Sequence, residues 1–151
     1  MTPDATAHVD VAASPQRVFE LVSDLRNLSG VAEEYAGGKW LDGSGPSVGA
    51  RFRGVNRRGR RVWPTTSTVT DCSVTRFAFE VRSLGLAVAR WQYDIEPTAG
   101  GCRVTESTWD RRPGWYVPIT RLATGVKDRA VTNQRNIEAT LERLKKVAES
   151  G

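Results

Sequence analysis

Apolar and polar residues alternate with different periods along the chain, and the changes of period divide it into three parts. The first part contains AHVDVA (7–12), expected to be a strand, and SPQRVFELVSD, where Ser14 and Pro15 suit the N-cap and first position of a helix. A second short helix is expected in LRNLSGVAEE (25–34). Over 38–110 the period is two, and turn sequences such as NRRG and TAGG separate six further strands.

The last part of the chain returns to a helical pattern. Its apolar residues recur at steps of three or four, or multiples of these, over 119–148. If the helix is unbroken over 118–149, it is about 45 Å long at ~1.5 Å per residue. Gly125 weakens the first third of this helix by up to ~1 kcal/mol relative to alanine, and the pair Asn133 and Gln134 interrupts the apolar stripe. Because strands joined by short connections favour an antiparallel sheet, the expected fold class is α+β.

One face of the expected sheet combines aromatic residues with a carboxylate. In the strand 88–97, Trp91 and Tyr93 share a face, and the alternation of 102–110 places Glu106 among apolar residues. Burying an unpaired carboxylate costs several kcal/mol. Two interpretations follow. Either Glu106 meets an arginine, a hydroxyl such as that of Tyr93, or water in a cavity, or a β-bulge shifts the register and exposes Glu106 to solvent.

Composition fits a globular protein with one domain. The 151 residues are 39% hydrophobic and 26% charged, so a single domain covering 1–151 is expected. No apolar run reaches the ~20 residues of a membrane-spanning helix. No secretory signal is visible at the start of the sequence, so a cytoplasmic protein is expected. The sequence leaves open whether the protein is a monomer or a homodimer.

Much of the net charge of +5 is concentrated around NRRG, at the tip of an expected hairpin. The exposed arginines Arg57, Arg58, Arg60 and Arg61 either discourage pairing at the edge of the sheet or give the hairpin a transient contact with an anionic membrane. Aromatic residues are not interleaved with the arginines as they are in platforms for single-stranded nucleic acids. No nucleic acid partner is therefore expected.

Few residues are available for metal binding or covalent catalysis. Two cysteines and one histidine, without motif spacing, do not fit a structural zinc site, so no metal and no other cofactor is expected. The sequence has no nucleophile motif and no glycine loop for phosphates or dinucleotides. Acid–base or positional chemistry remains, with Glu106 and Tyr93 as the candidate catalytic residues for proton transfer.

Several segments together resemble a known superfamily. The resembling segments, which cover nearly the whole chain, are HVDVAASPQRVFELVSD, VGARFRGVNRRG, TVTDCSVTRFAFEV, ARWQYDIEPTAGGCRVTES and the closing amphipathic helix. Their order resembles the START-like (helix-grip, SRPBCC) superfamily and its polyketide cyclase/dehydrase branch. The resemblance implies a curved seven-stranded antiparallel sheet wrapped around a long C-terminal helix, with two short helices between strands 1 and 2. It also implies a deep cavity between sheet and helix, in which different members bind lipids, sterols, polyketides or hormones.

The resemblance and the aromatic face together predict a ligand site. The expected function is binding of a small hydrophobic ligand, polyketide-like or lipid-like, with cyclisation or dehydration as the reaction if the protein is an enzyme, which the sequence leaves open. The alternative is a non-catalytic lipid carrier or sensor, and nucleic-acid binding through the basic hairpin ranks below it. The same aromatic side chains would also suit a filled core. The residues expected to contact the ligand are Phe52, Trp63, Phe79, Trp91, Tyr93, Glu106, Val126, Asn133 and Gln134.

Overall fold

The computed structural model describes residues 2–24, 35–41, 45–126 and 128–151. Within these residues, seven strands form one antiparallel sheet in the order β1-β7-β6-β5-β4-β3-β2. The strands are β1 (Ala5–Val11), β2 (Tyr35–Trp40), β3 (Arg51–Arg58), β4 (Arg61–Ser73), β5 (Arg76–Ser83), β6 (Leu86–Thr98) and β7 (Gly101–Asp110). The helices are α1 (Pro15–Ser23), the short 3-10 helix η2 (Gly114–Tyr116), α2 (Val117–Thr124) and α3 (Arg129–Ser150).

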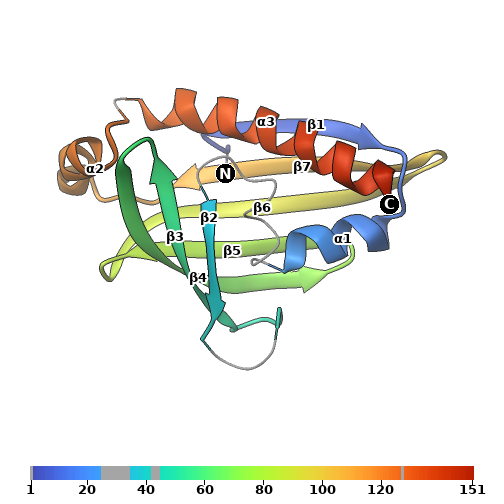
Figure 1. Ribbon diagram of the computed structural model, residues 1–151, viewed down its shortest axis with the longest axis horizontal. Coiled ribbons are helices and arrows are strands. Elements are labelled where there is room, and N and C mark those ends of the chain that lie inside the picture. The colour runs from blue at the N-terminus through green and yellow to red at the C-terminus, as the bar shows by residue number, and fades with distance from the viewer. Residues whose placement is uncertain (1, 25–34, 42–44, 127) are drawn as a thin grey trace.

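The sheet curls around α3 in the helix-grip arrangement that the sequence predicts (Figure 1). In this view β2 and β3 cross in front of the central strands, while α3 packs along β1 and β7. From β2 to β7 each strand pairs with the next one along the chain, and β1 completes the sheet by pairing with β7. The predicted α+β fold with a curved seven-stranded antiparallel sheet is therefore confirmed.

Side-chain caps define where α1 and α3 begin. Ser14 Oγ accepts a hydrogen bond from the Arg17 N–H at 3.1 Å, directly before Pro15. At α3, Asp128 Oδ1 accepts a hydrogen bond from the Val131 N–H at 3.3 Å. Each cap satisfies one of the N–H groups that the first turn of a helix leaves without a partner.

The C-terminal helical segment is broken at Gly125. α2 ends at Thr124, and Gly125 takes a left-handed conformation (φ 75°) in which its N–H donates to the Arg121 carbonyl at 2.9 Å. α3 then starts at Arg129 and has 22 residues, which gives a length of about 33 Å. An unbroken helix of about 45 Å is therefore not formed. The second short helix expected in 25–34 lies outside the described residues.

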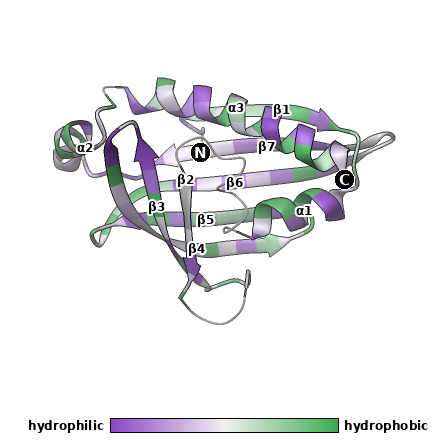
Figure 2. Ribbon diagram, viewed as in Figure 1, coloured by the Kyte–Doolittle hydropathy of each residue, from purple (hydrophilic) through white to green (hydrophobic). Residues whose placement is uncertain are grey.

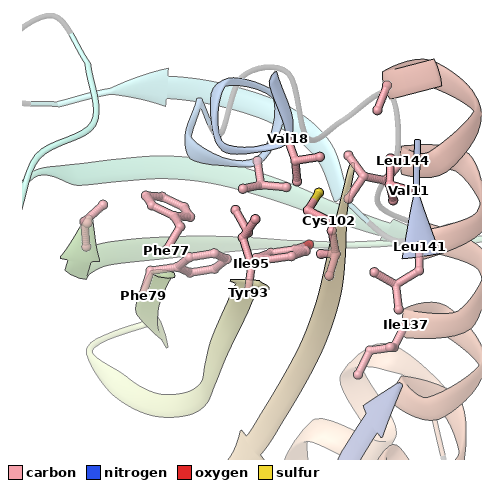
Figure 3. Close-up of a cluster of buried hydrophobic side chains, with 14 of the residues drawn as sticks. Val11, Val18, Phe77, Phe79, Tyr93, Ile95, Cys102, Ile137, Leu141 and Leu144 are labelled. Atoms are coloured by element: carbon pink, nitrogen blue, oxygen red, sulfur yellow. The ribbon is translucent and has the colours of Figure 1, made fainter. Parts of the chain in front are cut away.

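The interior is filled with side chains at the end of the sheet where α1 packs. There side chains of β5, β6, β7, α1 and α3 form one core, as Figure 3 shows for Phe77, Ile95 and Leu144, each at most 1% exposed. Figure 2 shows hydrophobic and hydrophilic bands alternating along α3, as expected for a helix with one face on the core. Other residues of this core include Val11, Val18, Val22, Cys102, Val104, Ile137 and Leu141.

Candidate functional site

Toward the α2 end of the molecule, the sheet and α3 enclose a cavity of about 270 Å³. Its position can be followed along the strands. On β5, Phe77 is fully buried in the core, and Phe79, the next residue on the same face, lines the cavity. On β6, Ile95 is buried in the core, whereas Tyr93 and Trp91 line the cavity. The interior therefore changes from filled to hollow along the same strands.

The helices close the cavity from the other side. The first twelve residues of α3 contribute Asn133, Asn136 and Thr140, whereas the following turns carry core residues such as Leu144. The wall as a whole combines apolar and aromatic side chains with isolated polar groups, which is the usual composition of small-molecule sites. The segment from η2 to the end of α2 adds Tyr116, Ile119, Thr120, Ala123 and Thr124.

Glu106 and Tyr93 are cross-strand partners on the cavity wall. The register of β6 and β7 pairs Tyr93 with Glu106. Glu106 is 3% exposed and Tyr93 is 2% exposed, and the two side chains share a hydrogen bond. Among the described residues, register shifts fall between β2 and β3, between β4 and β5, and between β5 and β6, but not along β7. The interpretation that a β-bulge exposes Glu106 is therefore wrong.

Burial controls the protonation of this pair. It raises the pKa of Glu106 from its ordinary 4.5 to about 8, because loss of hydration penalises the carboxylate more than the Tyr93 hydrogen bond stabilises it. Burial and the adjacent Glu106 also raise the pKa of Tyr93 well above its ordinary value of 10.0. Both groups are therefore mainly neutral at pH 7. Among the described residues, Oε1 of Glu106 has no hydrogen-bond partner.

Other polar groups of the cavity wall bond to nearby protein groups. Asn56 Nδ2 donates to Thr65 Oγ1 at 3.0 Å. Ser83 Oγ donates to the Pro64 carbonyl at 2.7 Å. Each of these contacts gives a polar side chain of the wall a partner within the protein.

An ion pair lies where the wall meets α2. Arg112 Nη2 lies 2.6 Å from Asp110 Oδ2, and Arg112 Nη1 donates to Thr120 Oγ1 at 2.6 Å. Burial alone would raise the pKa of Asp110, but the hydrogen bonds from Arg112 lower it below its ordinary value. The guanidinium of Arg129 lies 5.9 Å from the centroid of the Trp63 ring, within the range of a cation–π contact. Arg112 is thus engaged by protein groups on two sides.

The structure brings most of the predicted ligand contacts to one wall and places three elsewhere. The fully buried Phe52 packs against Trp40, with ring centroids 5.1 Å apart. Gln134 accepts from Thr6 N at 3.1 Å and donates to Thr6 O at 2.9 Å, so its amide joins α3 to the edge strand β1. Val126 is buried in the connection between α2 and α3. The predicted residues that line the cavity are Trp63, Phe79, Trp91, Tyr93, Glu106 and Asn133.

Some cavity residues were not predicted. Asn136 and Thr140 follow Asn133 by three and seven positions on α3, so a polar stripe at helical spacing is present in the sequence and could have identified them. Arg112 and Thr120 carry no comparable signal, because their contact depends on the path of the chain through η2 into α2.

The cavity opens beside exposed apolar side chains. Leu84, in the turn between β5 and β6, is 83% exposed, and Leu122 on α2 is 81% exposed. Leu84 and Ile119 also belong to the cavity wall. The arginine-rich β3–β4 hairpin is adjacent, since a Cβ added to Gly125 would lie 2.9 Å from Arg61 Nε. Figure 1 shows α2, the hairpin tip and the β5–β6 turn at the same end of the molecule. We refer to this region as the mouth.

The described residues contain no candidate metal site and no candidate membrane-spanning helix. None of their His, Cys, Asp and Glu side chains form a group of three or more that could hold a metal ion. Cys72 and Cys102 are free thiols, and burial raises the pKa of both. Within the part of the chain that the structure describes, no helix has the length and apolar character needed to cross a bilayer.

Comparisons with known proteins give one family and a set of similar structures. The model of the family described as "Polyketide cyclase / dehydrase and lipid transport" matches residues 2–149. The Polyketide_cyc-like protein Cgl2372 from Corynebacterium glutamicum is 25% identical, with a TM-score of 0.63 over 94% of this chain and 88% of that chain. No curated protein sequence matches the chain.

Two more distant structures show likeness of fold alone. The di-domain ARO/CYC StfQ from the steffimycin biosynthetic pathway is 14% identical, with a TM-score of 0.74 over 96% of this chain and 50% of that chain. The major latex-like protein 151 from Panax ginseng is 9% identical, with a TM-score of 0.72 over 95% of each chain.

Proposed function

Because the chain belongs to the polyketide cyclase / dehydrase and lipid transport family, we propose that its cavity binds a small hydrophobic ligand. The single observation that supports this most is the aromatic and apolar wall formed by residues such as Phe79 and Trp91 around about 270 Å³ of space. Small-molecule sites usually measure roughly 300–1,000 Å³. The ligand is therefore compact, or part of it stays outside the mouth.

The proposal predicts a specific role for Trp91. Replacing Trp91 by alanine should weaken binding of the neutral fluorescent probe N-phenylnaphthylamine at least about tenfold, because burying an aromatic side chain against an apolar guest contributes about 1.5–3 kcal/mol. Titration of the probe, followed by its fluorescence, measures the dissociation constant.

The matched control is Trp115→Ala, since Trp115 is 63% exposed and outside the cavity wall. This variant and Arg58→Ala should change the affinity less than about twofold. Equal losses in the Trp91 and Trp115 variants would contradict binding in the cavity.

The proposal includes a chemical step if the bound ligand is transformed. Orienting a flexible chain for ring closure can contribute about 7–11 kcal/mol to an intramolecular reaction. Glu106 and Tyr93 are the groups that would exchange protons with the ligand, since they are neutral donors on the wall. Native mass spectrometry of the freshly purified protein distinguishes carriage of an unchanged ligand from catalysis. A retained fatty acid supports carriage, whereas an aromatic polyketide that changes on incubation supports catalysis.

A second candidate function, carriage of a lipid, is favoured by the exposed apolar residues of the mouth. Leu84 and Leu122 would enter the interface of an anionic membrane, and the arginines of the β3–β4 hairpin would contact its headgroups. The double substitution Leu84→Ser and Leu122→Ser should lower binding to vesicles containing phosphatidylserine on the order of tenfold. Vesicle sedimentation measures this loss.

The control for this membrane contact is Val48→Ser. Val48 is exposed and lies before the start of β3, at the other end of that strand from the hairpin. This variant should bind vesicles as the wild type does. If the wild type shows no vesicle binding even at low salt, the proposal of a membrane contact is wrong.

A further inference from the structure

The buried carboxyl of Glu106 differs from the other polar groups described on the cavity wall. Asn56, Ser83 and Arg112 donate to protein acceptors at 3.0, 2.7 and 2.6 Å. Glu106 is 3% exposed and bonds to Tyr93, yet its Oε1 has no partner among the described residues. A buried polar atom without a partner is costly and calls for an explanation. A ligand group is the natural candidate, because Glu106 belongs to the cavity wall.

The chemistry around Glu106 determines which ligand group fits. Tyr93 donates its O–H to the carboxyl, so the free position of a neutral carboxyl is an O–H that seeks an acceptor. On the same cavity wall, α3 contributes the uncharged residues Asn133, Asn136 and Thr140, and the register partner of Glu106 on β1 is Ala7. Among the described residues, only burial and the Tyr93 hydrogen bond shift the pKa of Glu106, so no cation there balances a buried anion beside it.

The charged and titratable groups elsewhere on the wall do not change this conclusion. Arg112 is paired with Asp110, and Arg129 lies over the Trp63 ring. The titratable or charged residues of the wall are Tyr93, Glu106, Asp110, Arg112, Tyr116 and Arg129.

We infer that the cavity selects an uncharged ligand that carries a hydrogen-bond acceptor, such as a ketone or ester carbonyl oxygen, and that Glu106 donates to this acceptor. The inference rests on the proposed function, since it requires an apolar guest in the cavity. It disfavours ligands with a carboxylate, such as free fatty acids, because a buried carboxylate would lose its hydration and would meet no cation beside the protonated Glu106. The raised pKa of Glu106, about 8, keeps the donor protonated at neutral pH.

Three probes with the same ring system test this selection. Acetylnaphthalene carries a ketone, ethylnaphthalene has no strong acceptor, and naphthoate carries a carboxylate. Equilibrium dialysis at pH 6.5 measures the affinity of each probe for the wild type, Glu106→Gln and Glu106→Leu. We expect the wild type to prefer the ketone over the hydrocarbon by about tenfold, and to bind naphthoate more weakly than either.

The variants separate hydrogen bonding from packing. In Glu106→Gln the amide N–H can still donate, so the ketone preference should persist and should stay constant from pH 6.5 to pH 9. In the wild type the preference should fall over the same range, as the carboxyl loses its proton. Glu106→Leu has no donor, so it should bind ketone and hydrocarbon alike.

The possible outcomes distinguish this inference from the proposed function. If the wild type binds the ketone no more tightly than the hydrocarbon, the inference is overturned and the apolar site stands. The same holds if Glu106→Leu keeps the preference for the ketone. Stronger binding of naphthoate than of ketone also overturns it. If none of the three probes binds to the wild type, both the inference and the proposed function fail.

Discussion

Replacing Glu106 by glutamine is expected to stabilise the protein progressively as the pH rises. Relative to the wild type, the variant should gain about 3 kcal/mol in free energy of unfolding between pH 5 and pH 8. The reason is the raised pKa of Glu106, about 8 in the folded protein against an ordinary value of 4.5. Glutamine has a similar shape and does not ionise in this range.

The direction follows from proton binding in the two states. Between pH 4.5 and pH 8 the folded protein holds a proton on Glu106, whereas the unfolded chain does not. Unfolding therefore releases a proton, so the wild type loses stability as the pH rises through this window. Above pH 8 the folded carboxyl ionises as well and the loss levels off. Below pH 4.5 both states are protonated, and this contribution vanishes.

Urea unfolding of both proteins at several pH values measures the effect. Asp71 and Asp110, whose pKa values are lowered in the folded protein, change stability in the opposite sense at acidic pH. They do so in both proteins, so the difference between the two curves isolates Glu106. If the free energies of unfolding of the two proteins change in parallel from pH 5 to pH 8, Glu106 is not buried as described.

The second large effect is expected at Leu144. Leu144→Ala should destabilise the protein by about 2–5 kcal/mol, because Leu144 is fully buried where α3 meets the core and the truncation leaves a void. The matched control is Leu122→Ala, the same chemical change at a side chain that is 81% exposed. It should alter stability by no more than about 0.5 kcal/mol.

Denaturant unfolding of the two leucine variants provides the comparison. Similar destabilisation in both would mean that α2 contributes to the core as much as α3 does. That result would contradict the exposed position of Leu122 and would remove it from the mouth.

The architecture could be predicted because its signals are local and repeat along the chain. Alternation over 88–97 and 102–110 predicted the shared face of Tyr93 and Glu106, and the observed cross-strand register agrees. The break of the helix at Gly125 was harder to predict, because the apolar spacing continues through this residue. Only the capping geometry, with the Gly125 N–H on the Arg121 carbonyl, reveals that the helix stops there.

The candidate site could be predicted in part, for a related reason. Strand residues such as Trp91 reveal their face through alternation, so their position on the cavity wall follows from the pattern. A helical residue beside the apolar stripe can face the cavity or a neighbouring strand. Asn133 lines the cavity, whereas the next residue, Gln134, bonds to the backbone of Thr6 on β1. That choice depends on how α3 is rotated on the sheet, which is a property of the assembled fold.

α3 contacts the cavity mainly through its first turns and the core mainly through its last turns, and this arrangement has an evolutionary consequence. Substitutions at Asn133 and Asn136 would change the contacts offered to a guest, whereas Leu141 and Leu144 would still anchor the helix in the core. Mutations that diversify recognition therefore need not lower fitness through misfolding. A helix of this kind allows related proteins to differ in ligand specificity while they keep the same core packing.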